Sequence, residues 1–180
     1  GTVSVGHSSA FGTGAVAINT GVTVASDSAT ARSFSNTYSI GGTVTLGNAT
    51  NNGALTFAGT GSLSSAATLT TDSPVVFGGV LGGAFALTKA GASVLTLGGA
   101  NTFTGGVNLT GGTLRVGHDT GLGSGMLTLN TASVAVSSDS ATARTMCNAF
   151  TIGASVTLGD ATNSGAWTFG GTGAITANST

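Results

Sequence analysis

The chain has very little charge. Lys, Arg, Asp and Glu together make up 5% of its 180 residues, and Glu is absent. Typical soluble domains carry about 25% charged residues. Binding to nucleic acid phosphates needs clustered basic side chains, but the basic residues here are few and scattered, so the sequence argues against nucleic acid as a partner. These residues are Arg32, Lys89, Arg115 and Arg144.

Other features are equally scarce. Cys147 is the single cysteine, which excludes an intramolecular disulfide, and we expect it to be a small, half-buried residue rather than a reactive thiol. No run of 18 or more apolar residues exists, so no membrane-spanning helix is predicted. Gly interrupts every candidate helical stripe. The chain has neither an initiator Met nor a signal peptide, and we expect it to be a piece of something longer.

Gly and short alternating segments fill the sequence instead. Gly occupies 32 positions, and Val, Leu, Ile and Phe alternate with small polar residues through most of the chain. Runs such as 93–97 (SVLTL) and 126–129 (MLTL) have a period of two, which is typical of strands with one buried face. Disordered segments lack such regular aliphatic residues. The sequence therefore predicts an all-β protein.

A long duplication is the strongest signal. Residues 26–61 align without gaps to residues 138–173, and 24 of these 36 positions are identical. Upstream, residues 1–7 (GTVSVGH) align to residues 112–118 (GTLRVGH), so the offset is 111 there and 112 afterwards. Long repeats of this composition indicate stacked coils. We therefore expect one continuous solenoid segment over residues 1–180, with a repeat unit of about 112 residues: 1–111, and 112–180 as a partial copy.

The strand spacing alone also suits a sandwich or a barrel. Three observations favour a β-helix. Only Asn52-Gly53 provides the dipeptide typical of tight hairpins. The duplication is nearly in register, as stacked coils require. Low charge avoids repulsion between like side chains stacked about every 4.8 Å along a parallel ladder.

The middle of the chain carries a recognisable motif. Residues 75–83 (VVFGGVLGG), 87–91 (LTKAG), 94–106 (VLTLGGANTFTGG) and 107–117 (VNLTGGTLRVG) follow one another. They resemble the autotransporter-associated β-strand repeat of bacterial type V passenger domains and related giant surface proteins. Ser93, Phe103 and Val107 depart from that family's pattern, which has Gly, Tyr and Thr there.

The resemblance implies a right-handed parallel β-helix, export through the outer membrane of a Gram-negative-type cell, and display outside it. It implies coils of about 20 residues, hence roughly nine coils and a rod of roughly 40 Å. It also assigns structural roles to the motif positions, which are Leu87, Lys89, Gly91, Leu95, Leu97, Asn101, Phe103, Gly105, Gly106, Leu114, Val116 and Gly117.

Two sets of repeated polar residues are candidate sites. His7 and His118 occupy matching positions, but five or six coils separate them, too far for one metal ion, so we expect exposed turn residues. The heptapeptide SDSATAR, residues 26–32, recurs at 138–144. Within it a local ion pair between the Asp and the Arg is the simpler interpretation, and a sugar-binding site is the alternative.

Catalytic groups are poorly supported. Glycosidases need two carboxylates roughly 5 to 10 Å apart, and the acids here are spread along the chain. We expect no enzymatic activity, no cofactor and no metal. The acids are Asp27, Asp72, Asp119, Asp139 and Asp160.

Two further patterns have structural interpretations. Thr-x-Thr occurs at 43–45, 68–70 and 102–104, and these irregular spacings argue against a flat threonine array of the kind that binds ice. Aromatic residues recur at expected strand positions, which predicts rings stacked in the core. These are Phe57, Phe77, Phe85, Phe103, Phe150, Trp167 and Phe169.

Two functions remain open. The first is a structural stalk, spacer or filament body on the bacterial surface, and the near-identity of the two copies favours it. The second is an adhesin that recognises host or matrix glycans. Expected partners are other copies of the chain, end to end or laterally, or a host surface, together with the outer-membrane translocation machinery during export. Neither 1–5 nor 174–178 looks like a polar cap.

Overall fold

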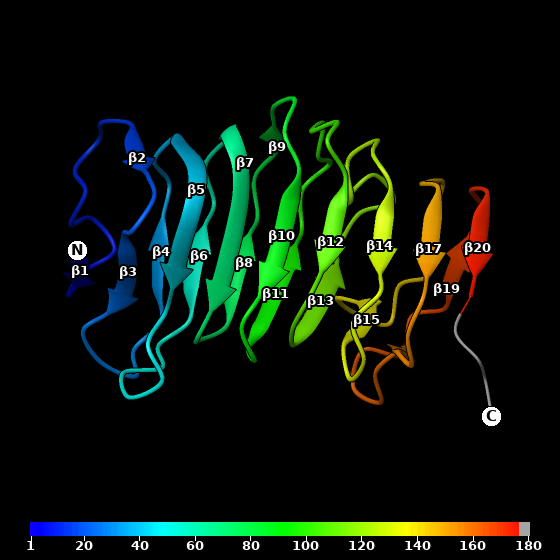
Figure 1. The fold of residues 1–180 in the computed structure, drawn as a ribbon. Helices are drawn as coiled ribbons and strands as arrows, with labels where there is room; N and C mark the ends of the chain where they lie inside the picture. Colours follow the sequence, from blue (N-terminus) through cyan, green and yellow to red (C-terminus); the bar gives the residue numbers. More distant parts are fainter. Residues whose placement is uncertain (177–180) are drawn as a thin grey trace.

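The computed structural model describes residues 1–176, and within that range all regular structure is β-strand. Each paired strand runs parallel to its neighbour. The chain winds from one end of a single stack to the other, with its N-terminal strands at one end and its C-terminal strands at the other (Figure 1). The predicted parallel β-solenoid is therefore confirmed.

Three columns of strands make up the walls. We name them in the order in which the chain visits them within a coil. The first column contains β1 (Thr2–Val5), β3 (Thr23–Ser26), the second half of β5 (Tyr38–Leu46), the second half of β7 (Gly61–Thr71), β10 (Leu87–Ala90), β12 (Val107–Leu109), β14 (Leu127–Leu129), β17 (Phe150–Ile152) and β20 (Gly173–Ile175).

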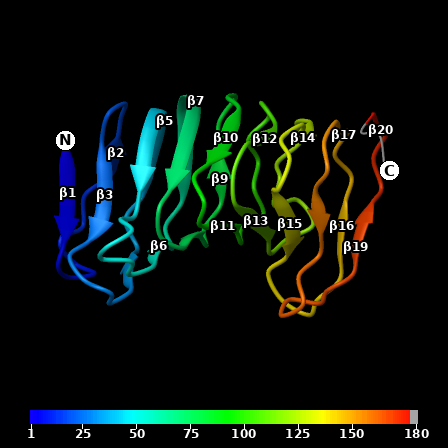
Figure 2. The same cartoon turned by 60° about the horizontal axis from the view of Figure 1, so that its bottom comes forward.

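The other two columns complete each coil. The second contains β4 (Arg32–Phe34), β6 (Leu55–Phe57), β8 (Val75–Phe77), β11 (Val94–Leu97), β13 (Thr113–Val116), β15 (Ala135–Ser138) and β18 (Thr157–Leu158). The third contains β2 (Val16–Ile18), the first halves of β5 and β7, and β9 (Leu81–Gly82). β16 (Arg144–Met146) and β19 (Trp167–Phe169) form a separate two-stranded sheet, and we assign it to the third column because the chain visits it between the second column and the first. Figure 2 shows the same succession after a rotation.

The stack makes about eight turns, since nine strands follow one another in the first column. The resemblance had implied roughly nine coils. Coils of 20 residues occur in the motif, where Leu87 pairs with Val107. Coils in the flanking copies are longer, as the pairing of Thr45 with Thr70 shows. The additional residues lie at the corners, between the paired segments.

A bend joins the third and first columns inside β5 and β7. Their register shifts between Ile40 and Gly42. Gly42 has φ +72°, a conformation that side chains with a Cβ rarely adopt, and a Cβ there would also overlap Thr20. Glycine at this position therefore lets one strand turn a corner of the solenoid without ending.

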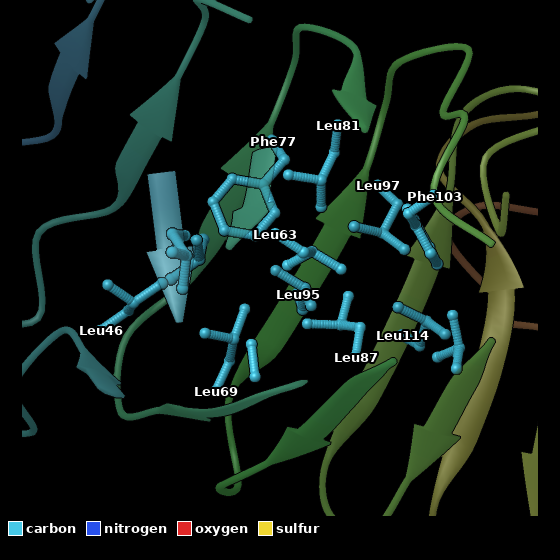
Figure 3. Close-up of a cluster of buried hydrophobic side chains, with 14 of the residues drawn as sticks. Leu46, Leu63, Leu69, Phe77, Leu81, Leu87, Leu95, Leu97, Phe103 and Leu114 are labelled. Atoms are coloured by element: carbon cyan, nitrogen blue, oxygen red, sulfur yellow. The ribbon is translucent and has the colours of Figure 1, made fainter. Parts of the chain in front are cut away.

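The core is a narrow channel filled by the inward-facing members of each strand. Leu46, Leu69, Leu87 and Leu95 have no measurable exposure, and Figure 3 shows such side chains converging from successive coils. One coil cannot bury its own apolar face, whereas stacking removes it from water at about 25 cal/mol per Å². Burial therefore depends on neighbouring coils.

Aromatic rings form a ladder at one end of this core. Phe34, Phe57 and Phe77 lie at successive centroid separations of 5.4 Å, and Tyr38 packs beside them. The prediction of core rings is confirmed for Phe57 and Phe77, and also for Phe103, which lies in a loop rather than a strand.

Other rings depart from that prediction. Phe85 is 43% exposed, so its assignment to the core is wrong; it lies in the corner between β9 and β10, next to the exposed residues 83 and 84. Phe150, Trp167 and Phe169 are half-buried and pack against the edge of the core.

Two of the rings cover glycines of the next coil. A Cβ on Gly61 would overlap the ring of Tyr38, and a Cβ on Gly173 would overlap the ring of Phe150. These are equivalent pairs in the two copies, with Tyr38 paired to Gly61 and Phe150 to Gly173 across the ladder. The glycine thus provides the space for a ring on the strand below it.

We expect Tyr38→Phe to leave the free energy of unfolding within about 1 kcal/mol of wild type, or to raise it, because a buried hydroxyl without a partner contributes nothing. The Tyr38 hydroxyl is buried without a hydrogen-bond partner, and burial raises its pKa. Urea unfolding followed by circular dichroism measures the change. A loss above 2 kcal/mol would mean that the hydroxyl has a stabilising partner.

Glycines also line the corner between the second and third columns. A Cβ on Gly79 would overlap the carbonyl oxygen of Gly59, and a Cβ on Gly99 would overlap that of Gly79. Gly59 stands in the same relation to Asn36 of the coil below. Successive coils therefore approach at this corner more closely than any side chain permits.

Candidate functional site

Lys89 is the most unusual residue of the motif. Its side chain is completely buried on β10, and its Nζ donates hydrogen bonds of 2.9 Å to the carbonyl oxygens of Ala90, Gly91 and Gly111. Gly111 belongs to the following coil. The ammonium group therefore ties the turn after β10 to the turn above it, and its three donors match three acceptors.

The surroundings of Lys89 disfavour its charge. Burial lowers its pKa to about 8, and the Asp72 carboxylate opposes this shift. The ordinary value is 10.5. Because the folded pKa lies below the unfolded one, the unfolded chain holds the proton more tightly between these two values.

We therefore expect the free energy of unfolding to rise as the pH increases from about 8 to about 10.5, relative to the variant Lys89→Met. Stability curves of both proteins in urea at several pH values measure this. Other titrating groups act equally on both proteins, so the difference isolates Lys89. A difference that is constant over this pH range would contradict the shift.

Asn101 makes a second set of buried hydrogen bonds between coils. Its Oδ1 accepts from the Leu81 backbone N–H at 2.8 Å, and its Nδ2 donates to the Gly121 carbonyl at 2.7 Å. The side chain thus bridges the coils on both sides of it. Asn36 and Asn148 play a related role in the two copies, each donating to two carbonyls of the preceding coil.

The motif glycines stand where space or conformation requires them. Gly91 and Gly106 have φ of +80° and +85°, and a Cβ on Gly105 would overlap the backbone of Ala86. Gly117 faces the Asp139 carboxylate of the next coil. The motif's apolar positions, all buried, are Leu87, Leu95, Leu97, Phe103, Leu114 and Val116.

The repeated heptapeptide forms the same corner loop in both copies. Arg32 Nη2 lies 2.6 Å from Asp27 Oδ1, and Arg144 Nη2 lies 3.1 Å from Asp139 Oδ1. The predicted local ion pair is therefore confirmed. Arg32 also donates from Nε to the Val5 carbonyl of the preceding coil.

A third ion pair had no signal in the sequence. Arg115 Nη2 lies 2.7 Å from Asp160 Oδ2, although 45 residues separate them. Asp160 also accepts from the backbone N–H of Thr162 and Asn163. The first copy has Asn48 at the equivalent of Asp160, with the same two backbone acceptor bonds but no arginine. Only the fold reveals that Arg115 reaches this turn.

Acid should weaken this turn. The Thr162 N–H, followed by Arg115 and the Asn163 side chain, holds the pKa of Asp160 below its ordinary 3.8. A depressed carboxyl pKa stabilises the fold above the unfolded value and loses that effect below it. We expect wild type to lose more stability than Asp160→Asn on acidification from pH 5 to pH 2. Asn is native at position 48, so the variant keeps the two backbone bonds of the turn and loses the charge together with the Oδ2 acceptor of Arg115 and Asn163. Equal losses would contradict this assignment.

His7 and His118 are exposed turn residues, as predicted. Each Nδ1 accepts a backbone N–H two residues ahead and contacts the hydroxyl there, that of Ser9 and Thr120 respectively. Each ring therefore closes its own local turn. Among residues 1–176 there is no cluster of three His, Cys, Asp or Glu side chains suited to a metal ion.

Cys147 is exposed, so the expectation of a half-buried residue is wrong. It follows Met146, whose side chain points inward, and alternation along the strand therefore directs Cys147 outward. Cys147 lines a surface hollow together with Asp119, Thr145 and Asn148. A second hollow borders Tyr38.

The threonine pattern is more regular than its spacing in sequence indicated. Thr43 pairs with Thr68, and Thr45 with Thr70, so two of the three Thr-x-Thr segments lie side by side. The argument from irregular spacing was wrong for these two, because the additional residues between them enter corner loops. The outward row then continues through further coils to Thr88, Asn108, Thr128 and Thr151.

These features define a parallel β-solenoid whose central coils are tied by one buried lysine and one buried asparagine. Residues 87–116 match the family described as Passenger-associated-transport-repeat. The resemblance of this segment to a passenger repeat is therefore confirmed. In addition, the chain is 46% identical over 92 residues to the adhesin BmaC autotransporter of Brucella suis biovar 1 (strain 1330).

That match covers 46% of this chain and 3% of the adhesin, so the chain spans a small part of its relative's length. No solved structure matches the chain significantly. Residues 1–176 contain no helix that could span a membrane.

Proposed function

We propose that this chain is a spacer segment in a passenger protein displayed on the surface of a Gram-negative bacterium. The observation that carries the proposal is the repetition of surface features: both copies present the same corner loop with the same ion pair. A segment that serves by its length and stiffness needs uniform coils. A dedicated binding site needs a surface found in one place only.

The mechanism is mechanical. Strands lie across the long axis, so the main-chain hydrogen bonds between coils run along the rod, and tension on the rod loads many of them together. Lys89 and Asn101 add side-chain bonds between coils in the same direction. The scarcity of charge lets coils stack without repulsion.

The proposed role is non-enzymatic. Asp27 and Asp139 each pair with an arginine of their own loop, and Asp160 pairs with Arg115. Carboxylates occupied in this way stabilise turns and are unsuited to the paired acid and base roles of a glycosidase. The hollows beside Tyr38 and Cys147 lie on the surface of the coils.

An adhesive module is the second candidate, and the similarity to an adhesin favours it. The two roles predict different results when the segment is shortened. Removing residues 26–137 joins Ala25 to Ser138 and recreates the native heptapeptide at the junction. A spacer loses length and keeps the binding of its parent protein, whereas an adhesive module loses binding.

The deletion of residues 26–137 is tested in the protein that carries the segment. Electron microscopy should show a rod shortened by about 26 Å, from about 4.8 Å per turn, and adhesion of the bacteria to cultured cells should be unchanged. A fall in adhesion with normal surface display would instead support the adhesin. Micrographs of the purified chain would also test the expected end-to-end or lateral association of copies.

A further inference from the structure

The two copies of the repeat do not stack on the same columns. β1 and β3 lie in the first column, but their sequence equivalents, β13 and β15, lie in the second. β4 and β6 lie in the second column, and their equivalents, β16 and β19, pair with each other in the third. Every strand assigned in both copies moves on by one column.

The remaining strands complete the pattern. β2 and the first halves of β5 and β7 pair in the third column. Their equivalents, β14, β17 and β20, pair in the first. No duplicated strand keeps its column, so the shift is a property of the whole repeat within residues 1–176.

The repeat length explains this shift. Five register steps along the first column lead from β1 through β3, β5, β7 and β10 to β12. The sequence equivalent of β1 is β13, which is the next strand after β12 and belongs to the second column. One repeat is therefore five turns plus one of three columns, or five and one-third turns.

The corner loop follows the same rule. Residues 26–32 connect β3 to β4, at the corner between the first and second columns. Residues 138–144 connect β15 to β16, between the second and third. The loops share one internal geometry: Ser26 and Ser138 each donate from Oγ at 2.8 Å to the carbonyl four residues ahead. In each loop the three residues before the arginine are exposed.

We infer that the repeat rotates its surface by one third of a turn per copy, so that the same loop is displayed to a different side of the rod in successive copies. A further copy at the same spacing reaches the third corner. The repeated surface therefore winds around the rod and leaves no side with a continuous row of loops. A partner that recognises one loop, such as an antibody, binds neighbouring copies from different sides without mutual exclusion.

Engineered disulfides test the column shift directly. All variants carry Cys147→Ser, which removes the exposed thiol. Asn108 and Thr128 are direct neighbours in the first column, and both are half-buried. Parallel neighbours lie about 4.8 Å apart, within the Cα range of a disulfide. The control pair is Thr102 and Thr128. Thr102 lies above Leu81 on the third column. If equivalent strands of the two copies shared a column, β14 would lie with β2 in the third column and would stack on Thr102.

We expect Asn108→Cys/Thr128→Cys to form an intramolecular disulfide under mild oxidation and Thr102→Cys/Thr128→Cys to remain reduced. Thiol titration and mass spectrometry of tryptic peptides distinguish the two. The reverse pattern would overturn the inference by placing equivalent strands of both copies on one column.

A Fab raised against the peptide SDSATAR tests whether the two loops face different sides of the rod. The two loops are separated by about 26 Å along the axis, at about 4.8 Å per turn, less than the width of a Fab. We expect two Fabs per chain, projecting about 120° apart in negative-stain class averages. Thr30→Lys and Thr142→Lys, each at an exposed loop position, should each remove the Fab on one side. Two parallel Fabs, or mutual exclusion that leaves one, would contradict the rotation. Neither result bears on whether the rod serves as a spacer.

Discussion

Gly79→Ala should lower the free energy of unfolding by about 3 kcal/mol or more, the upper range for overpacking. The added methyl group would overlap the carbonyl oxygen of Gly59. That oxygen belongs to the backbone of the coil below, so no side-chain rotation relieves the contact. The coils must separate locally, which lengthens ladder hydrogen bonds and opens the apolar core beneath Phe77.

Gly78 provides the control for the Gly79→Ala variant. A Cβ on Gly78 finds its nearest atom, Ala58 Cα, at 3.8 Å, an ordinary van der Waals distance. Gly78→Ala should therefore change stability by less than about 1 kcal/mol. Urea unfolding of both variants gives the comparison. If the two substitutions cost the same, the close approach of coils at the glycine corner is not the cause.

Lys89→Met should destabilise the fold by about 2–3 kcal/mol at pH 7, in the range for losing hydrogen bonds to a charged donor. Methionine fills a similar volume but donates nothing. The carbonyls of Ala90, Gly91 and Gly111 then lose the donor that joins them. Because one of these belongs to the next coil, the loss should appear as faster hydrogen exchange in both β10 and β12.

Asp72→Asn serves as the matched control for that variant. Asp72 is exposed and acts on Lys89 only through its charge. Its substitution should change stability by less than about 1 kcal/mol, as for other weak exposed charge interactions. A Lys89→Met protein as stable as wild type would show that burial of the ammonium costs as much as its three hydrogen bonds contribute.

The sequence predicted the fold because the alternation of apolar residues is local. Runs such as 94–97 have a period of two whatever coil they join, and the motif of residues 87–117 carried the resemblance. Lys89 was assigned a structural role, but its burial was not foreseen, since a lysine in an alternating strand gives no sign of three carbonyls converging on its end.

The number of residues in each corner could not be predicted from the sequence. Residues 64–66 form a corner of β7 where β5 has Gly41 alone, and this difference decides that Thr43 faces Thr68. Errors in the coil count and in the threonine row share that origin. The pair Arg115–Asp160 and the column shift likewise depend on how many residues each corner absorbs.

The stack of eight turns is tested most directly by a distance along the rod. In the Cys147→Ser background, spin labels at Ser4 on β1 and Ala174 on β20 lie at opposite ends of the first column, and both positions are exposed. Eight steps of about 4.8 Å give about 38 Å along the axis, and the two positions are four residues out of register, about 13 Å along the strand, so the backbone separation is about 41 Å. Pulsed electron spin resonance should show one distribution centred near this distance. A centre below about 25 Å, as in a closed barrel or sandwich whose sheets pack about 10 Å apart, would contradict the parallel stack.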